Sequence, residues 1–189
     1  MSICTQTEKT DEQLVVASLS DAGQFACIIL RYEKKLFRYV QRTLFVNKED
    51  TEDILQEVFI KVYRNLNSFN PKYKFSSWIY RITYNECINH LRNHNHDKNQ
   101  VNLEVESDTY NELIADINLE SDAIKADKQK QVQHLLEQLD EKSRTVLILK
   151  YIEEKDYNEI ADILETSTGN VGSLVNRAKS KFKKIIETN

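Results

Sequence analysis

Residues that interrupt helices are scarce in this sequence, and their scarcity limits the folds open to it. The 189 residues include three glycines and one proline, while 40% are hydrophobic and 30% are charged. A turn-rich β sandwich uses more glycine and proline than this, whereas helices joined by short turns do not. The composition therefore predicts an all-α protein, and its length suits two small helical domains.

Three amphipathic helices are predicted in the first half of the chain. The first follows Asp21, with hydrophobic residues at spacings of three and four: Phe25, Ile28, Ile29, Tyr32, Leu36 and Val40. The second begins after Asn47, ends near Pro71 and has its own buried stripe: Ile54, Leu55, Val58, Val62 and Leu66. The third is capped by Ser76 or Ser77, and one side of it is not expected to be core: Trp78, Arg81, Asn85, Asn89 and Arg92.

The helical pattern is lost between about residues 93 and 127, a stretch that contains nine aspartates and glutamates but only two lysines. We interpret this stretch as an acidic linker, although it carries enough hydrophobic residues for part of it to order on a partner. The predicted organisation is an N-terminal tail over residues 1–20, a first domain over 21–95, the linker over 96–127 and a second domain over 128–189.

The second domain ends in the pattern of a helix-turn-helix. A short helix, YNEIADIL, and the turn ETST precede a long helix whose buried stripe is Val171, Val175, Ala178, Phe182 and Ile185. Such a motif places the start of its second helix in the major groove of DNA. The residues expected to contact DNA are Thr168, Asn170, Ser173, Asn176, Arg177, Lys181 and Lys184. Alternatively, the lysine-rich end is a solvated helix terminus that the helix dipole favours.

Aromatic, basic and amide side chains alternate between residues 69 and 92, a mixture that can stack unpaired bases while following a phosphate backbone. They are Phe69, Lys72, Tyr73, Phe75, Trp78, Arg81, Asn85, Asn89 and Arg92. The alternative is that aromatic residues at helical spacing form core.

No motif for catalysis is found: a Gly-rich phosphate loop, G-x-S-x-G and H-E-x-x-H are all missing from the sequence. We therefore expect no catalytic residue and no cofactor. A metal site at His90, His94 and His96 is not expected either, because they lie where the third helix runs into the linker. Three cysteines without a C-x-x-C spacing, and no leader or membrane-spanning stretch, favour a cytoplasmic protein with no membrane insertion.

The motifs, in this order, resemble the extracytoplasmic-function (ECF) sigma factors of bacterial RNA polymerase, the two-domain form of the sigma-70 family. EDTEDILQEVFIKVYRNL resembles region 2.2, whose D-x-x-Q-[ED]-x-[FW] core is here Asp53, Gln56, Glu57 and Phe59. FNPKYKFSSWIYRITYNECINHLRN is similar to regions 2.3 and 2.4, and the residues from Leu139 to Lys184 are similar to region 4.

The resemblance implies a sigma factor that directs RNA polymerase to promoters and helps to melt them. In the family, region 2.2 binds the β′ clamp helices, regions 2.3 and 2.4 melt and read the minus-ten element, and region 4 reads the minus-thirty-five element at the β flap. An anti-sigma factor is a common partner. One departure stands out: Gly172 and Leu174 occupy two usually basic positions of the recognition helix, so fewer DNA contacts are expected there.

Two other classes of function remain open at this point. One is a helix-turn-helix regulator that binds duplex DNA alone and uses its first domain to dimerise or sense a signal. The other is an enzyme acting on nucleic acid, which the missing catalytic motifs disfavour. The region 2.2 residues and the aromatic segment argue against the regulator.

Overall fold

The structure is a computed structural model and describes residues 9–93 and 128–188. Within these two ranges the regular structure is helical and contains no strand, so the all-α prediction is confirmed. None of the helices in the same ranges is long and apolar enough to cross a membrane. The predicted linker, His94 and His96 lie outside the described residues.

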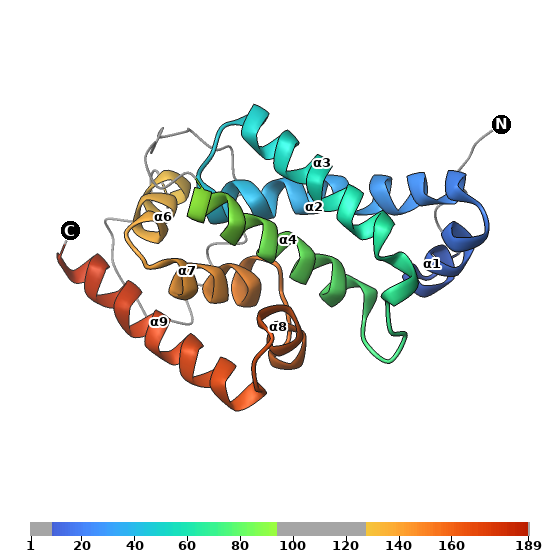
Figure 1. Ribbon diagram of the computed structural model, residues 1–189. Helices are drawn as coiled ribbons and strands as arrows, with labels where there is room; N and C mark the ends of the chain where they lie inside the picture. The colour runs from blue at the N-terminus through green and yellow to red at the C-terminus, as the bar shows by residue number, and fades with distance from the viewer. Residues whose placement is uncertain (1–8, 94–127, 189) are drawn as a thin grey trace. The chain divides into compact units, whose positions relative to one another are not determined.

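The chain forms two compact units (Figure 1). The N-terminal unit contains α1 (Asp11–Ser20), the short segments η1 (Ala22–Gln24) and η2 (Leu66–Ser68), and the longer helices α2 (Phe25–Leu44, as far as Gln41), α3 (Lys48–Arg64) and α4 (Phe75–Asn93). The C-terminal unit contains α6 (Lys128–Glu137), α7 (Glu141–Leu147), the π-helical segment η4 (Ile148–Ile152), α8 (Tyr157–Leu164) and α9 (Thr168–Thr188).

Helix α1 lies where the sequence predicts a tail, so that prediction is wrong for Asp11–Ser20. Thr10 and Gln13 form a reciprocal capping box, in which the side chain of each accepts a hydrogen bond from the backbone N–H of the other. The helix buries Leu14 and Val15 and packs against η2 and α4. It therefore belongs to the N-terminal unit.

The other N-terminal helices form as the hydrophobic pattern predicts. Asn47 caps α3 by accepting a hydrogen bond from the Asp50 N–H at 2.8 Å. The predicted stripe of α3 and η2 is buried, with Val58 and Val62 fully enclosed. The cap predicted for α4 is wrong, because this helix already begins at Phe75 and the Lys74 carbonyl accepts from the Trp78 N–H. An ion pair of 2.6 Å joins Lys61 of α3 to Glu86 of α4.

The C-terminal unit is organised around α9, which packs against α6, α7 and α8 (Figure 1). Val171, Val175, Ala178 and Phe182 are at most 1% exposed, which confirms these members of the predicted stripe. Helix α8 begins with a capping box between Asp156 and Glu159, and its C-cap is Glu165, whose φ of 50° is left-handed. The turn between α8 and α9 thus takes only the three residues 165–167.

We expect the Asp156 cap to contribute measurably to the stability of this unit. Replacing Asp156 with Ala removes the acceptor for the Glu159 N–H and should cost about 1 kcal/mol of unfolding free energy. Asp156→Asn keeps an acceptor and is the matched control, with a loss below about 0.5 kcal/mol. Urea unfolding followed by circular dichroism measures both variants. Equal losses in the two variants would show that the charge, and not the cap oxygen, stabilises the helix.

Candidate polymerase and nucleic-acid interfaces

The side of α3 opposite its buried stripe carries three of the four residues predicted to bind polymerase. Asp53, Gln56 and Glu57 are exposed, whereas Phe59 is half-buried. Among the described residues, no hydrogen bond or ion pair engages the carboxylates of Asp53 and Glu57. They therefore remain available to a partner outside the chain.

Sequence reasoning missed two exposed hydrophobic residues farther along this side. Ile60 is 41% exposed and Tyr63 is 47% exposed, although the Tyr63 ring also contacts Phe25 edge to face. Ile60 follows Glu57 by three residues and Tyr63 follows Ile60 by three, which is the spacing of one helical face. The signal was present in the sequence, since neither belongs to the buried stripe. We call Asp53, Gln56, Glu57, Ile60 and Tyr63 the α3 outer face. Hydrophobic residues beside unpaired carboxylates are typical of a protein-binding surface.

Three of the aromatic residues predicted to bind the minus-ten element are buried together. Phe69, Phe75 and Trp78 are at most 8% exposed, and their ring centroids lie 5.4 to 5.6 Å apart. We call these three residues the aromatic cluster. The expectation that Trp78 projects from a side of α4 outside the core is wrong, because Phe69 and Phe75 cover its ring. For these rings, the alternative of a core role describes the structure better.

The exposed residues of this region lie on the loop before α4 and farther along the helix. A turn at Pro71 is closed by the Tyr73 N–H, which donates to the Asn70 carbonyl at 3.0 Å. This turn leaves Lys72 exposed and Tyr73 54% exposed. Farther along the helix, Asn85, Asn89 and Arg92 are exposed, while Arg81 is half-buried. We call Lys72, Tyr73, Asn85, Asn89 and Arg92 the α4 surface.

Polar side chains in the first turn of α9 hydrogen-bond to α8 and to the turn between the two helices. The Thr168 hydroxyl donates to Asn158 Oδ1 of α8 at 3.1 Å, and the Asn170 amide donates to Thr166 Oγ1 at 2.7 Å. Ser173, Asn176 and Arg177 follow on the exposed side, and Arg177 Nε donates to the Ser173 carbonyl. Thr168 and Asn170 thus tie the start of α9 to α8 and to the preceding turn, while the next turn presents donors and acceptors to solvent.

Lys181, predicted to bind DNA, has a partner inside its own unit. Its Nζ lies 2.5 Å from Asp140 Oδ1 and 3.3 Å from the Ser143 hydroxyl. Asp140 is also the N-cap of α7, accepting from the Ser143 N–H at 3.2 Å. Lys181 therefore ties α9 to the start of α7. Lys184, one turn later, is exposed.

The environment of Asp140 lowers its pKa. Partial burial acts to raise the pKa of the carboxyl group, but hydrogen bonds from Lys181 and Ser143 outweigh that effect and hold it below the ordinary value of 3.8. A carboxylate with a lowered pKa stabilises the folded state above the unfolded pKa, and the stabilisation is lost as the pH falls through the folded pKa.

The stability conferred by Asp140 should therefore depend on pH. Asp140→Asn keeps a capping oxygen but removes the charge, so wild type should exceed this variant in stability near neutral pH and lose its advantage on acidification below about pH 4. Urea unfolding at a series of pH values, followed by circular dichroism, measures the difference. Glu187→Gln, which alters an exposed pair with Lys183, serves as the control. A difference that stays constant with pH would contradict the assignment.

Within the described ranges, no group of three or more metal-ligating side chains is placed to hold an ion. His90 lies on α4 and belongs to no such group within those ranges. The residues described above lie mainly on exposed surfaces of the two units.

Comparisons with known proteins agree with this arrangement of two helical units. Residues 28–96 match the family model for sigma-70 region 2, and residues 129–182 match the model for sigma-70 region 4. The chain is 34% identical to the ECF RNA polymerase sigma factor SigW of Bacillus subtilis over 169 residues, covering 87% of this chain and 89% of that protein. It is 28% identical to the ECF RNA polymerase sigma-E factor of Escherichia coli K12 over 179 residues, covering 92% and 93%.

Solved structures show the same fold. CnrH, determined in complex with the cytosolic domain of CnrY, matches with a TM-score of 0.69 and 21% identity, covering 95% of this chain and 98% of CnrH. The sigma factor RpoE from Bartonella quintana, determined with the anti-sigma factor NepR, matches with a TM-score of 0.65 and 17% identity, covering 87% and 98%.

A helical unit with an exposed acidic helix face, followed by a helix-turn-helix unit, is thus the architecture of a transcription initiation factor. The chain belongs to the ECF group of the sigma-70 family of RNA polymerase sigma factors. Proteins of this family direct RNA polymerase to promoters and bind both the core enzyme and promoter DNA.

Proposed function

We propose that this sigma factor divides its task among three exposed surfaces. The α3 outer face binds the core polymerase at the β′ clamp helices, the α4 surface binds the minus-ten element, and the exposed side of α9 binds the minus-thirty-five element. The observation that carries this proposal is the α3 outer face. Its carboxylates are exposed, have no partner among the described residues and lie beside two exposed hydrophobic side chains.

Binding by the α3 outer face suits a partner with basic and hydrophobic groups. Asp53 and Glu57 project on one side because they are four residues apart, and the stripe on the other side anchors the helix in the core. Ile60 and Tyr63 add hydrophobic area that becomes buried on association. The acidic surface could not bind DNA, since phosphates repel carboxylates, so a regulator that binds only duplex DNA would not account for it.

At the minus-ten element, Tyr73 is the ring that we assign to base stacking. It is 54% exposed at the tip of a turn, next to the exposed cation of Lys72. An exposed ring beside a cation can stack an unpaired base while the cation contacts the phosphate. The buried aromatic cluster then supports the loop and does not itself contact the base.

At the minus-thirty-five element, Ser173, Asn176 and Arg177 are placed to read base edges, and Lys184 to contact phosphate. Binding is the whole of this role: nucleotide chemistry belongs to the polymerase, and the chain acts in the cytoplasm, where polymerase and promoters meet. An anti-sigma factor that covers one of these surfaces would inactivate the protein, as the partner named with the RpoE structure suggests by analogy.

Charge reversal on the α3 outer face should weaken polymerase binding. We expect the double variant Asp53→Lys, Glu57→Lys to bind core RNA polymerase at least tenfold more weakly, which is about 1.4 kcal/mol. Titration of labelled protein with core polymerase measures the dissociation constant, and circular dichroism checks the helical content. The charge-matched control reverses Glu154 and Glu187, two exposed carboxylates of the C-terminal unit. Unchanged binding by the α3 variant would refute this part of the proposal.

Loss of the Tyr73 ring should impair promoter opening. Tyr73→Ala is expected to destabilise the open complex by about 1–3 kcal/mol, the value of one base stacked on an aromatic ring. Tyr73→Phe keeps the ring and should retain opening. Permanganate footprinting of the holoenzyme on promoter DNA reports unpaired thymines in both variants. Trp78→Ala is unsuitable for this test, because removing a buried aromatic ring costs about 3–5 kcal/mol of folding stability.

Lys184 and Arg177 should affect DNA binding in different ways. Lys184→Gln is expected to reduce the slope of log K against log salt by roughly 0.9 without changing the preferred sequence, because a phosphate contact is lost. Lys184→Arg keeps the charge and should keep the slope. Arg177→Ala should instead alter the preferred minus-thirty-five sequence. Salt titrations of holoenzyme binding to promoter variants measure both quantities. An unchanged slope for Lys184→Gln would show that Lys184 does not contact phosphate and is only part of a solvated helix end.

A further inference from the structure

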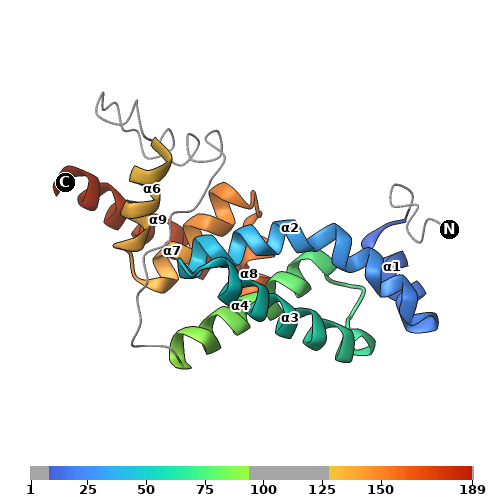
Figure 2. The ribbon, with the colours of Figure 1, turned by 90° about the horizontal axis from the view of Figure 1, so that it is seen from above.

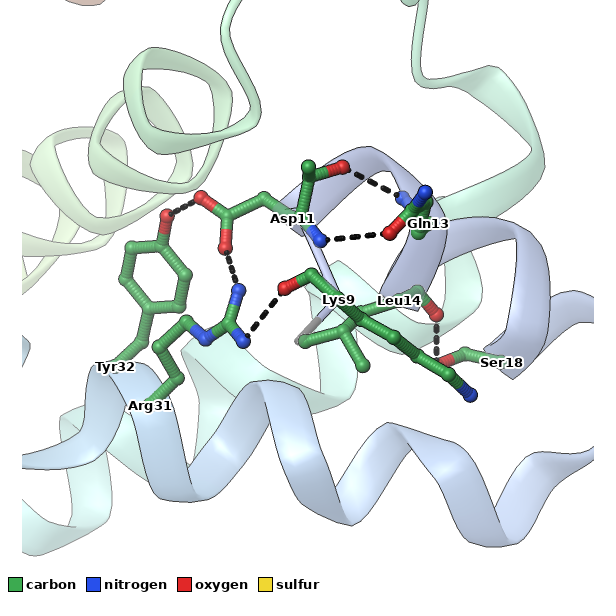
Figure 3. A network of polar contacts seen from close by, with 8 residues as sticks. Lys9, Asp11, Gln13, Leu14, Ser18, Arg31 and Tyr32 are labelled. Carbon is green, nitrogen blue, oxygen red and sulfur yellow. Dashed lines mark hydrogen bonds and ion pairs between the residues drawn. The ribbon is translucent and has the colours of Figure 1, made fainter. Parts of the chain in front are cut away.

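Helix α1 is fastened to α2 by one carboxylate whose two oxygens are both engaged (Figure 3). Asp11 Oδ1 accepts from Arg31 Nη1 at 2.6 Å, and Asp11 Oδ2 accepts from the Tyr32 hydroxyl at 2.5 Å. Arg31 Nη2 also donates to the Lys9 carbonyl at 2.9 Å. The start of α1 is therefore held by charged and neutral hydrogen bonds to two adjacent residues of α2.

Tyr32 connects this attachment to the aromatic cluster. It is 4% exposed, and its ring meets the ring of Phe75 edge to face, with centroids 5.7 Å apart and planes at 74°. Burial raises the pKa of the Tyr32 hydroxyl well above its ordinary value, and the hydrogen bond to Asp11 raises it further. The hydroxyl is thus protonated near neutral pH and donates its hydrogen to Asp11.

The aromatic cluster in turn supports the loop that carries Tyr73. Phe69 contacts Phe75 and Trp78 and directly precedes the turn formed by Asn70 and Tyr73. Helix α1 also packs against η2, the segment that leads into Phe69. Figures 1 and 2 both show the loop between α3 and α4 at the end of the unit where α1 lies. A continuous series of contacts therefore runs from Asp11 to the loop.

We propose that Asp11 is a positioning residue for promoter opening: through Tyr32 it fixes the aromatic cluster that holds the Tyr73 loop in place. The inference rests on the proposed role of Tyr73 at the minus-ten element. Asp11 acts on the loop from outside it, since its carboxylate contacts Arg31 and Tyr32 and not the loop itself. Removing the Asp11 charge should release the start of α1 and loosen the cluster without unfolding the unit.

Trp78 is the single tryptophan of the chain and belongs to the aromatic cluster, so its fluorescence reports this coupling directly. In Asp11→Asn, we expect the quenching of Trp78 by acrylamide to increase about twofold or more, as for a locally opened segment. Tyr32→Phe removes one of the two bonds to Asp11 and should have the same effect to a smaller degree. Glu12→Gln removes the neighbouring charge and should behave as wild type.

The coupling to function is tested by combining variants in the holoenzyme. Permanganate footprinting should show less opening for Asp11→Asn, while binding to core polymerase is unchanged. If Asp11 acts through the Tyr73 loop, adding Asp11→Asn to Tyr73→Ala should cause no further loss of opening. Additive losses would overturn the inference, as would Trp78 quenching that Asp11→Asn leaves unchanged.

These outcomes separate the inference from the proposed function. Should Tyr73→Ala open promoters normally, the proposed role of Tyr73 fails, and with it the role of Asp11 in opening, whatever the fluorescence shows. Should Tyr73→Ala fail to open promoters while Asp11→Asn opens them normally, only the inference fails. If Asp11→Asn loses helical content, Tyr32→Phe is judged by the same two criteria.

Discussion

One-sided burial of helices is the constraint on which the structure depends. Helices α3 and α9 each bury one stripe, and each enclosed hydrophobic side chain of such a stripe contributes about 1.5–3 kcal/mol. In α9, Val171, Val175 and Phe182 are essentially inaccessible to solvent, as Val58 and Val62 are in α3. Fixing these stripes in the core fixes the rotation of both helices, so the residues on the opposite sides are held outward with no further interaction needed.

The outward sides are then free to differ in chemistry. The α3 outer face carries two carboxylates and two hydrophobic side chains, which suits a protein partner, and the exposed side of α9 is mostly polar and basic, which suits DNA. An acidic chain with a formal net charge of −4 can therefore bind nucleic acid, because the cations are concentrated on particular surfaces. The same separation explains how one short chain can hold a polymerase and a promoter at once.

The spacing of hydrophobic residues predicted the buried stripes of α3 and α9. It also predicted the two helices that form the helix-turn-helix, because all of these depend on local spacing alone. It missed α1, whose hydrophobic residues Leu14, Val15, Val16 and Leu19 do not fall on one side; the pair Thr10 and Gln13 was the available signal. It also misplaced Trp78, since Phe69 covers that ring through a turn that helical geometry does not describe. The tie between Lys181 and Asp140 joins residues 41 positions apart, which no local pattern reveals.

The claim that this chain acts through the polymerase, and not as an independent DNA-binding protein, is open to one direct measurement. Fragmented DNA of the host can be transcribed by core RNA polymerase with and without the chain, and the 5′ ends of the transcripts mapped, while DNA bound by the chain alone is sequenced in parallel. We expect a set of specific 5′ ends that requires the chain, and no comparable enrichment of those promoters by the chain without polymerase. Equal enrichment of the same sites without polymerase, with no new transcripts, would contradict the assignment and indicate a duplex-binding regulator.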